Sequence, residues 1–326
     1  MTLKILVVGG AGYIGSHMVK RLGAESAGVV TLDNLSSGHR DAVRHGDFVQ
    51  GDIADPGLLA ELFSAHRFDA VMHFASHIEV GESMRLPAKY YRNNVANTLN
   101  LLEAVVAAGI NKFIFSSTAA IFGLPVYTPI DERHPQAPIN PYGRSKQIIE
   151  QVLGDFDRAH GLRSTCLRYF NAAGADPEGE LGERHDPESH LIPLTLQVAS
   201  GRRAAIGLFG TDYDTPDGTC IRDYVHVTDL CEAHWLALQA LLAGATSDAY
   251  NLGNGAGFSV REVIDTARRV SGRDIPVIEQ PRRAGDPPRL VADATRAKSA
   301  LHWQPRYADL ETIIEHAWNY ERSRSP

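Results

Sequence analysis

Long apolar runs, clustered cysteines and an excess of basic residues are all missing from this 326-residue chain. No run approaches the ~20 apolar residues of a membrane-spanning helix, so we expect no membrane partner. A formal net charge of -7 argues against a nucleic-acid partner, which would require clustered Lys and Arg. Cys166, Cys220 and Cys231 form no CxxC pair, and the stretch MTLKILVVGGAGYIG has no processing site, so we expect reduced thiols and a cytoplasmic protein.

Metal-ligand patterns are also scarce, although the chain has 14 histidines. His73 and His77 lie across an expected strand end and a loop and not on one helical face, and no HExxH occurs. We therefore expect no metal site and assign these two histidines to the fold or to a cofactor pocket.

What the first half does contain is a repeated alternation of short apolar runs and helical patterns. Buried parallel strands are expected at KILVVGG, GVVTLDN, DFVQGDI, DAVMHFA and NKFIFSS. Apolar residues at helical spacing predict one helix over Ala88 to Ala108, after Pro87 and before Gly109. This order predicts an α/β fold with a doubly wound parallel sheet of the Rossmann type.

The alternation stops after LRSTCLRYFN, where a loop rich in Gly, Pro and acidic residues begins. Two helices and a strand are expected at HLIPLTLQVASG, SVREVIDTARRVSG and AAIGLFG, with a terminal helix at LETIIEHAWNYERS. We therefore expect a first domain over 1–170, to which about 222–250 returns. A smaller mixed α/β lobe is expected over 171–221 and 251–326.

A dinucleotide site is indicated by Gly9, Gly12 and Gly15, a GxxGxxG that follows a strand and opens a helix. Glycines there permit a tight turn and let the backbone approach a pyrophosphate at the helix N-terminus. The next strand ends at Asp33, whose carboxylate suits an adenosine ribose and would repel a 2′-phosphate, so NAD is favoured over NADP. Asp52, after the third strand, is either a contact to the adenine amine or an ordinary polar strand end.

A catalytic group is indicated by Tyr142 and Lys146, which stand four residues apart in YGRSK and so share a helical face. A nearby ammonium favours the phenolate, which makes the tyrosine a usable proton shuttle. Thr118 ends the strand-terminal FSST and offers a hydroxyl at the edge of the sheet.

These motifs, in this order, resemble the extended short-chain dehydrogenase/reductase superfamily. The blocks GGAGYIGSH, DNLSSGHR, HFASHIEVGES, YYRNNV, NPYGRSK, RYFNAAG, HLIP, GTCIRDYVHVTDL and RRAGDPP resemble the UDP-glucose 4-epimerase family over nearly the whole chain. The resemblance implies interconversion of UDP-glucose and UDP-galactose through a 4-keto sugar, with Tyr142 as acid/base, Thr118 on the 4-oxygen and Lys146 on the nicotinamide ribose.

The resemblance also implies the ligand contacts. The first domain would bind NAD through Gly9, Gly12, Tyr13, Ile14, Gly15, Asp33, Asn34, Ser37, Gly38, Asp52, Ile53, Phe74, Ala75, Asn93, Ser116, Tyr142, Lys146 and Tyr169. The second lobe would bind a UDP-hexose, with Asn171, Arg222 and Arg283 on the diphosphate, Phe209 on uracil and Asp286 on the uridine ribose. The remaining implied substrate residues are Thr118, His190, Leu191 and Leu290.

Two positions differ from the pattern of well-known members of the family. Ile78 stands where many have a lysine on the NAD pyrophosphate, so one cofactor contact is absent or replaced. By the resemblance, Leu290 aligns with the residue that borders the sugar C2 substituent, where tyrosine accompanies exclusion of N-acetyl groups. The shorter leucine predicts some activity on UDP-N-acetylhexosamines.

Other functions stay open at this stage. A UDP-glucuronate or UDP-pentose 4-epimerase would use the same hydride cycle, and an NAD-sensing regulatory protein would use the fold without catalysis. Ala119 and Ala120 follow Thr118 where a 4,6-dehydratase would have an Asp-Glu pair, so dehydration is not expected. The resemblance further implies a homodimer through a four-helix interface.

Overall fold

Seven parallel strands form the central sheet in the computed structural model, which describes residues 3–283 and 285–324. The order β11-β6-β5-β4-β1-β2-β3 reverses direction at β1, which places a crevice at the carboxyl ends of β1 and β4. This confirms the predicted doubly wound α/β fold. The strands are β1 (Lys4–Val8), β2 (Gly28–Asp33), β3 (Asp47–Gln50), β4 (Ala70–His73), β5 (Lys112–Thr118), β6 (Arg163–Tyr169) and β11 (Asp248–Leu252).

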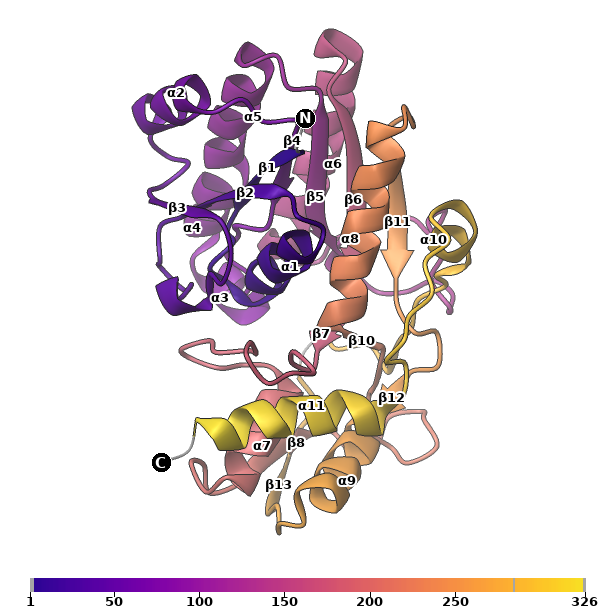
Figure 1. The fold of residues 1–326 in the computed structure, drawn as a ribbon. Coiled ribbons are helices and arrows are strands. Elements are labelled where there is room, and N and C mark those ends of the chain that lie inside the picture. The colour runs from indigo at the N-terminus through magenta and orange to yellow at the C-terminus, as the bar shows by residue number, and fades with distance from the viewer. Residues whose placement is uncertain (1–2, 284, 325–326) are drawn as a thin grey trace.

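Helices cover both faces of this sheet (Figure 1). In β1 the side chains of Ile5 and Val7 join one apolar core, while Leu6 and Val8 join the other. This is the period-two alternation of a strand that is buried on both faces. The first core is closed by α1 (Tyr13–Ala24) and α8 (Val227–Leu242), and the second by α2 (Pro56–Ala65), α5 (Asn97–Ala107) and α6 (Pro141–His160).

The helix expected over Ala88 to Ala108 is present, but it is not α-helical throughout. It runs without a break through α4 (Pro87–Tyr90), a π-helical turn over Tyr91–Ala96 and α5, and a separate short helix, α3 (Val80–Arg85), precedes it. The buried Asn94 lies in that turn, where its side chain bonds both backbone groups of His77 and the hydroxyl of Ser145. A π turn widens the helix by one residue and often marks a functional site; here the turn places an amide between the loop after β4 and α6.

A smaller lobe lies below the carboxyl edge of the sheet in Figure 1. Its apolar core is built from α7 (Leu191–Ala199), α9 (Val260–Ser271) and α11 (Leu310–Ser323), together with the parallel pair β8 (Ile206–Phe209) and β13 (Val277–Gln280). Two small sheets lie between the lobes. They are β7 (Asn171–Ala173) with β10 (Tyr224–His226), and β9 (Ile221–Arg222) between β12 (Phe258–Ser259) and β14 (Arg289–Leu290).

The chain passes between the two lobes more often than the sequence indicates. The returning segment contributes α8 and β11 to the large domain. A later stretch, with α10 (Thr295–Ala300), also packs there, although the expectation assigned it to the second lobe. Trp303 is fully buried in the large-domain core and its indole donates to the carbonyl of Asp229 at 2.9 Å. For the rest of the chain we propose the domain boundaries expected from the sequence, with 1–170 and about 222–250 in the large domain and the other residues in the smaller lobe.

Short 3-10 turns over Arg40–Ala42 and Ala119–Phe122 complete the described elements. Among residues 3–283 and 285–324, no helix combines the length and the apolar character that crossing a membrane requires.

Candidate active site

The turn between β1 and α1 depends on two of its three glycines for close backbone packing. Gly9 has φ +82°, and a Cβ there would lie 2.4 Å from the amide nitrogen of Ala75. A Cβ on Gly15 would lie 2.1 Å from the carbonyl oxygen of Gly9. A Cβ on Gly12 would meet only that same oxygen, at 3.4 Å. No other protein atom lies within 4 Å of it, so the turn is open next to Gly12.

The open side of this turn suits an anion. Gly12 caps α1 without any side-chain bond, and the first turn holds no acidic residue. The amides of Tyr13, Ile14 and Gly15 lie in the first turn of α1, where backbone N–H groups have no partner within the helix. The positive end of the helix dipole lies at the same place. Those are the properties of a pyrophosphate site.

A hollow at the ends of β1 and β2 gathers the residues predicted for adenosine. Asp33 is 8% exposed, and its two oxygens accept from the amides of Ala11 at 2.9 Å and Leu35 at 2.8 Å. Burial raises the pKa of Asp33, and these amides oppose the rise. The hollow is lined by Val8, Leu32, Asp33, Asn34, Gly51, Asp52, Ile53, Ala75 and Asn93.

Asp52 lies on the rim of this hollow and is bonded within the protein. Its carboxylate accepts from the side chain of Asn34 at 2.7 Å and from the amide of Ala54 at 2.8 Å. Asn34 in turn accepts from the amide of Ser36. In this structure Asp52 therefore orients Asn34 along the rim of the hollow.

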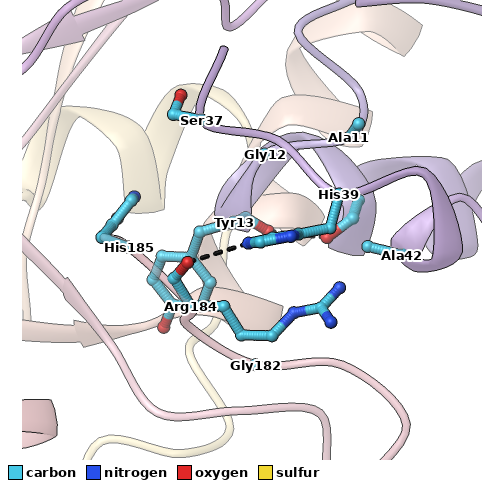
Figure 2. Close-up of a pocket in the computed structure, with 10 residues that line it drawn as sticks. Ala11, Gly12, Tyr13, Ser37, His39, Ala42, Gly182, Arg184 and His185 are labelled. Carbon is cyan, nitrogen blue, oxygen red and sulfur yellow. Dashed lines mark hydrogen bonds between the residues drawn. The ribbon is translucent and has the colours of Figure 1, made fainter. Parts of the chain in front are cut away.

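A second hollow lies under the glycine turn (Figure 2). It includes Tyr13 and Ser37, and also two residues that the sequence reasoning missed, His39 and Arg184. The ring of His39 contacts the carbonyl of Arg184 at 2.9 Å, and the Arg184 guanidinium bonds both carboxylate oxygens of Asp41 at 2.8 and 2.9 Å. These residues are more than 140 positions apart, so no local signal could have joined them.

Gly38, in the loop after β2, must be a glycine because a side chain there would collide with its neighbours. A Cβ at Gly38 would lie 2.9 Å from the carbonyl carbon of Ala11 and 3.0 Å from a carboxylate oxygen of Asp33. The loop after β2 can therefore cross the glycine turn closely only with glycine at this position.

The predicted catalytic residues meet where β5 ends and α6 begins. Asn140 caps α6 by accepting from the amide of Gly143 at 2.8 Å, and Pro141 occupies the first turn. Thr118 is 7% exposed at the end of β5, where its hydroxyl accepts from the amide of Ala120 at 3.1 Å and lies close enough to Tyr142 to lower the pKa of that phenol. Lys146, 3% exposed, donates from Nζ to the carbonyl of Ser116 at 2.8 Å.

Burial dominates the electrostatics of the Tyr142 and Lys146 pair. It raises the pKa of Tyr142, opposed only by the hydroxyl of Thr118. It lowers the pKa of Lys146 to about 7, opposed by the negative charge of Glu150 and by Cys166. Lys146, which was expected to lower the tyrosine pKa, is not among the groups that shift the pKa of Tyr142, and its Nζ bonds the Ser116 carbonyl.

Aromatic residues form the wall behind this pair. The hydroxyl of Tyr169 is hydrogen-bonded to that of Ser116, and the buried ring of His234 lies 5.9 Å from Tyr169 and 4.9 Å from Phe74. Burial raises the pKa of Tyr169 and lowers that of His234 to about 4, so both groups are neutral near pH 7.

The smaller lobe pairs its predicted substrate residues with one another. Arg222 bonds Asp286 at 2.7 Å, and Arg283 lies over the Phe209 ring at 3.9 Å from its centroid. Arg222 also donates to the carbonyls of Ile221 and Pro287. Its guanidinium is thus held by three acceptors within the protein.

The other substrate candidates lie at the junction of the lobes. Asn171 opens β7 and donates to the carbonyl of Asp223 at 3.1 Å. Leu290, opposite Arg222 in the β9–β14 pairing, packs against the apolar cluster that follows Thr118. His190 precedes α7 and contacts two glutamates, and Leu191 is the first residue of that helix.

Comparisons with known proteins agree with this geometry. Residues 5–253 match the NAD dependent epimerase/dehydratase family. UDP-glucose 4-epimerase of Rhizobium meliloti (strain 1021) is 53% identical over 98% of this chain and 98% of its own length. The crystal structure of UDP-glucose 4-epimerase from Brucella ovis in complex with NAD has a TM-score of 0.95 at 51% identity, covering 97% of this chain and 98% of that one.

A third relative extends the range of sugars. The UDP-Glc/GlcNAc 4-epimerase from Campylobacter jejuni has a TM-score of 0.87 at 46% identity, covering 98% of this chain and 99% of that one. The glycine turn, the adenosine hollow and the Thr118, Tyr142 and Lys146 group thus occur in a chain that resembles these proteins along its whole length. This chain belongs to the NAD-dependent epimerase/dehydratase family, with the UDP-glucose 4-epimerases as its relatives.

Proposed function

We propose that this chain interconverts UDP-glucose and UDP-galactose by inverting C4 of the sugar. The observation that carries the proposal is the contact of Tyr142 with Thr118 where β5 meets α6, at the same sheet edge as the glycine turn. It is supported by relatives named UDP-glucose 4-epimerase that are about half identical over nearly the full length. NAD, when bound, supplies the acceptor and donor of the hydride at C4.

Each catalytic residue has a role that its position supports. The Tyr142 phenol takes the proton of the sugar 4-hydroxyl and returns it after the 4-keto sugar has presented its other face. Thr118 hydrogen-bonds the same oxygen, which fixes the proton path. Lys146 supplies a positive charge one helical turn away and would bond the nicotinamide ribose.

The substrate lobe offers charges that exchange partners when UDP binds. Arg222 and Asp286 neutralise each other in the ligand-free protein. A diphosphate would take the guanidinium fork, and the freed Asp286 carboxylate could accept from a ribose hydroxyl. Arg283 and Asn171 would complete the diphosphate site, and the Phe209 face would receive uracil.

A second substrate class is favoured by Leu290. Its side chain packs beside the segment that follows Thr118, and leucine is smaller than tyrosine. We propose some activity on UDP-N-acetylglucosamine and UDP-N-acetylgalactosamine. The relative from Campylobacter jejuni, described as a UDP-Glc/GlcNAc 4-epimerase, supports this proposal.

Proton NMR tests these proposals. Purified protein is incubated without added NAD, with UDP-galactose and separately with UDP-N-acetylgalactosamine, and the epimers are resolved. Tyr142→Phe should lower kcat by roughly 10²- to 10⁴-fold. Tyr307→Phe is the matched control and should leave kcat unchanged, because the Tyr307 ring packs against His226 and His316 and not against the Tyr142 group.

Other outcomes of this experiment identify the alternatives. Silence on both hexoses, with turnover of UDP-glucuronate or a UDP-pentose, would replace the hexose proposal. Silence on every UDP-sugar, with NAD bound, would favour an NAD-sensing regulator. Activity that requires added NAD would agree with the missing lysine contact at Ile78.

We further propose a homodimer and a cytoplasmic location. The dimer rests on the resemblance, with α5 and α6 in the interface, and sedimentation equilibrium tests it: a single species of monomer mass would overturn it. The location is supported by Cys166, Cys220 and Cys231, all of which are buried and free.

A further inference from the structure

Four metal-ligating side chains gather in the loop just before α7, away from Tyr142 and Thr118. Glu183, His185, Glu188 and His190 each offer one ligand atom, and these four atoms all lie within 4.8 Å of one another. Their spacing in the sequence is E-x-H-x-x-E-x-H, which is separate from His73 and His77 and differs from the HExxH pattern, the two features on which the expectation of no metal site rests.

The carboxylates of this cluster are buried without a Lys or Arg partner. The side chains of Glu183 and Glu188 are only 5% and 4% exposed, and among the residues that the structure describes their ion-pair partners are His185 and His190 alone. Two carboxylates so close together in a dry site need a compensating positive charge, which the two imidazoles supply when they are protonated and which a bound cation would supply when they are neutral.

A neighbouring acidic group shows how this chain supplies such a charge elsewhere. The Nζ of Lys20 lies 2.9, 2.6 and 3.0 Å from Asp176, Glu178 and Glu180. The carboxylates at Glu183 and Glu188 have no equivalent of Lys20 within the described chain.

Both imidazoles bring Nδ1 close to both carboxylates. His185 Nδ1 lies 3.0 Å and His190 Nδ1 2.6 Å from the same oxygen of Glu183, and 3.9 and 3.3 Å from an oxygen of Glu188. Both Nδ1 atoms are buried, yet neither makes a hydrogen bond of acceptable geometry. Four potential ligand atoms this close together, with neither Nδ1 in a hydrogen bond, form a candidate ligand set for one ion.

The separations also have the right size. Metal–ligand bonds of about 2.0–2.1 Å in a tetrahedron place the ligand atoms about 3.4 Å apart. The four nitrogen–oxygen distances run from 2.6 to 3.9 Å and bracket that value. Two imidazoles with two carboxylates suit Zn²⁺ among the common divalent ions, whereas Mg²⁺ and Ca²⁺ prefer oxygen ligands alone.

We propose that Glu183, His185, Glu188 and His190 bind one Zn²⁺ ion, which assigns His190 to the ion in place of the substrate contact that the resemblance implies for it. Two carboxylates and two neutral imidazoles around Zn²⁺ give a site of zero net charge. Four protein ligands close the coordination sphere, which is the pattern of a structural site and leaves no open position for substrate.

The position of the cluster indicates what the ion would hold. His185 lies beside Tyr13 of the glycine turn (Figure 2), with ring centroids 6.3 Å apart. Ser189 reaches Glu79, after β4, with a bond of 2.7 Å, and His190 leads into α7. The ion would therefore fix the start of the smaller lobe against the cofactor turn of the large domain.

Elemental analysis tests the proposal on the full-length protein, prepared without a polyhistidine tag and desalted after incubation with ZnCl₂. We expect about one zinc per chain in the wild type, less than a tenth of that in His185→Gln and in Glu188→Gln, and an unchanged content in His160→Gln and Glu178→Gln. The last two change an exposed histidine and an exposed glutamate outside the cluster. A zinc-free wild type, or full zinc content in both cluster variants, would overturn the proposal.

A measurement on the wild type keeps the test valid if the cluster variants do not fold. Crystals of the zinc-incubated protein, measured on either side of the zinc absorption edge, should give an anomalous peak among the four side chains. Absence of that peak would refute the site. A peak elsewhere, bound by other residues, would refute it equally.

Discussion

Replacing Glu150 with glutamine removes one partner of a buried ion pair beneath the catalytic helix. Arg168 on β6 bonds Glu150 on α6 through Nε at 3.0 and 3.1 Å and through Nη2 at 2.5 Å. The two side chains are only 7% and 8% exposed. Glu150 also accepts from the hydroxyl of Ser117, the residue before Thr118.

The expected cost follows from the charge that is left behind. An uncompensated buried guanidinium costs about 3–5 kcal/mol, because water cannot replace the lost carboxylate. We therefore expect Glu150→Gln to lower the free energy of unfolding by about that amount. Replacing both partners by apolar residues, Glu150→Leu with Arg168→Met, should recover most of it, since no buried charge then remains.

Urea unfolding followed by circular dichroism measures these differences, compared at equal m-values. The control is Asp155→Asn, which removes the exposed partner of Arg158 on the same helix, at 68% and 75% exposure. That change should cost less than about 1 kcal/mol. A loss below about 1 kcal/mol for Glu150→Gln, or a double replacement that is less stable than either single one, would refute the reasoning.

Three further predictions concern the cofactor turn, the buried lysine and the sugar pocket. Gly15→Ala puts a Cβ 2.1 Å from the Gly9 oxygen, so NAD measured in the purified protein should be lost, whereas Gly81→Ala, with open space around it, should keep it. Burial lowers the pKa of Lys146 from 10.5 to about 7. The buried ammonium therefore lowers the free energy of unfolding by its full amount below pH 7, and by progressively less as the pH rises to 10.5. Lys146→Met should therefore stabilise the ligand-free protein most at or below pH 7 and not at all by pH 10.5; thermal melts with the opposite trend would contradict this. Leu290→Tyr should lower kcat/KM for UDP-N-acetylgalactosamine at least about tenfold relative to UDP-galactose, and an unchanged ratio would remove Leu290 from the pocket.

Local patterns in the sequence were sufficient for much of the large domain. Short apolar runs predict β1, β2, β4 and β5 because a strand buried on both faces must be apolar throughout. The glycines of the turn were recognisable because the tight backbone approach at Gly9 and Gly15 excludes any side chain. Tyr142 and Lys146 were recognisable because a helix places residues four apart on one face.

Other features were decided only by the tertiary structure. The π turn at Asn94 forms because that side chain finds partners at His77 and Ser145, which no helical periodicity encodes. The resting electrostatics of Tyr142 depend on burial, which overrides the charge that the spacing of Lys146 suggests. Such effects arise from desolvation and from neighbours that are distant in sequence.

The sequence by itself determined the elements, the cofactor turn and the family, because these depend on residues that lie near one another along the chain. The tertiary structure decided the partners across long separations: His39 with Arg184, Arg222 with Asp286, and α10 with the large-domain core. Those contacts depend on how two lobes close on each other, and the distance between two segments in the folded chain has no fixed relation to their separation in sequence.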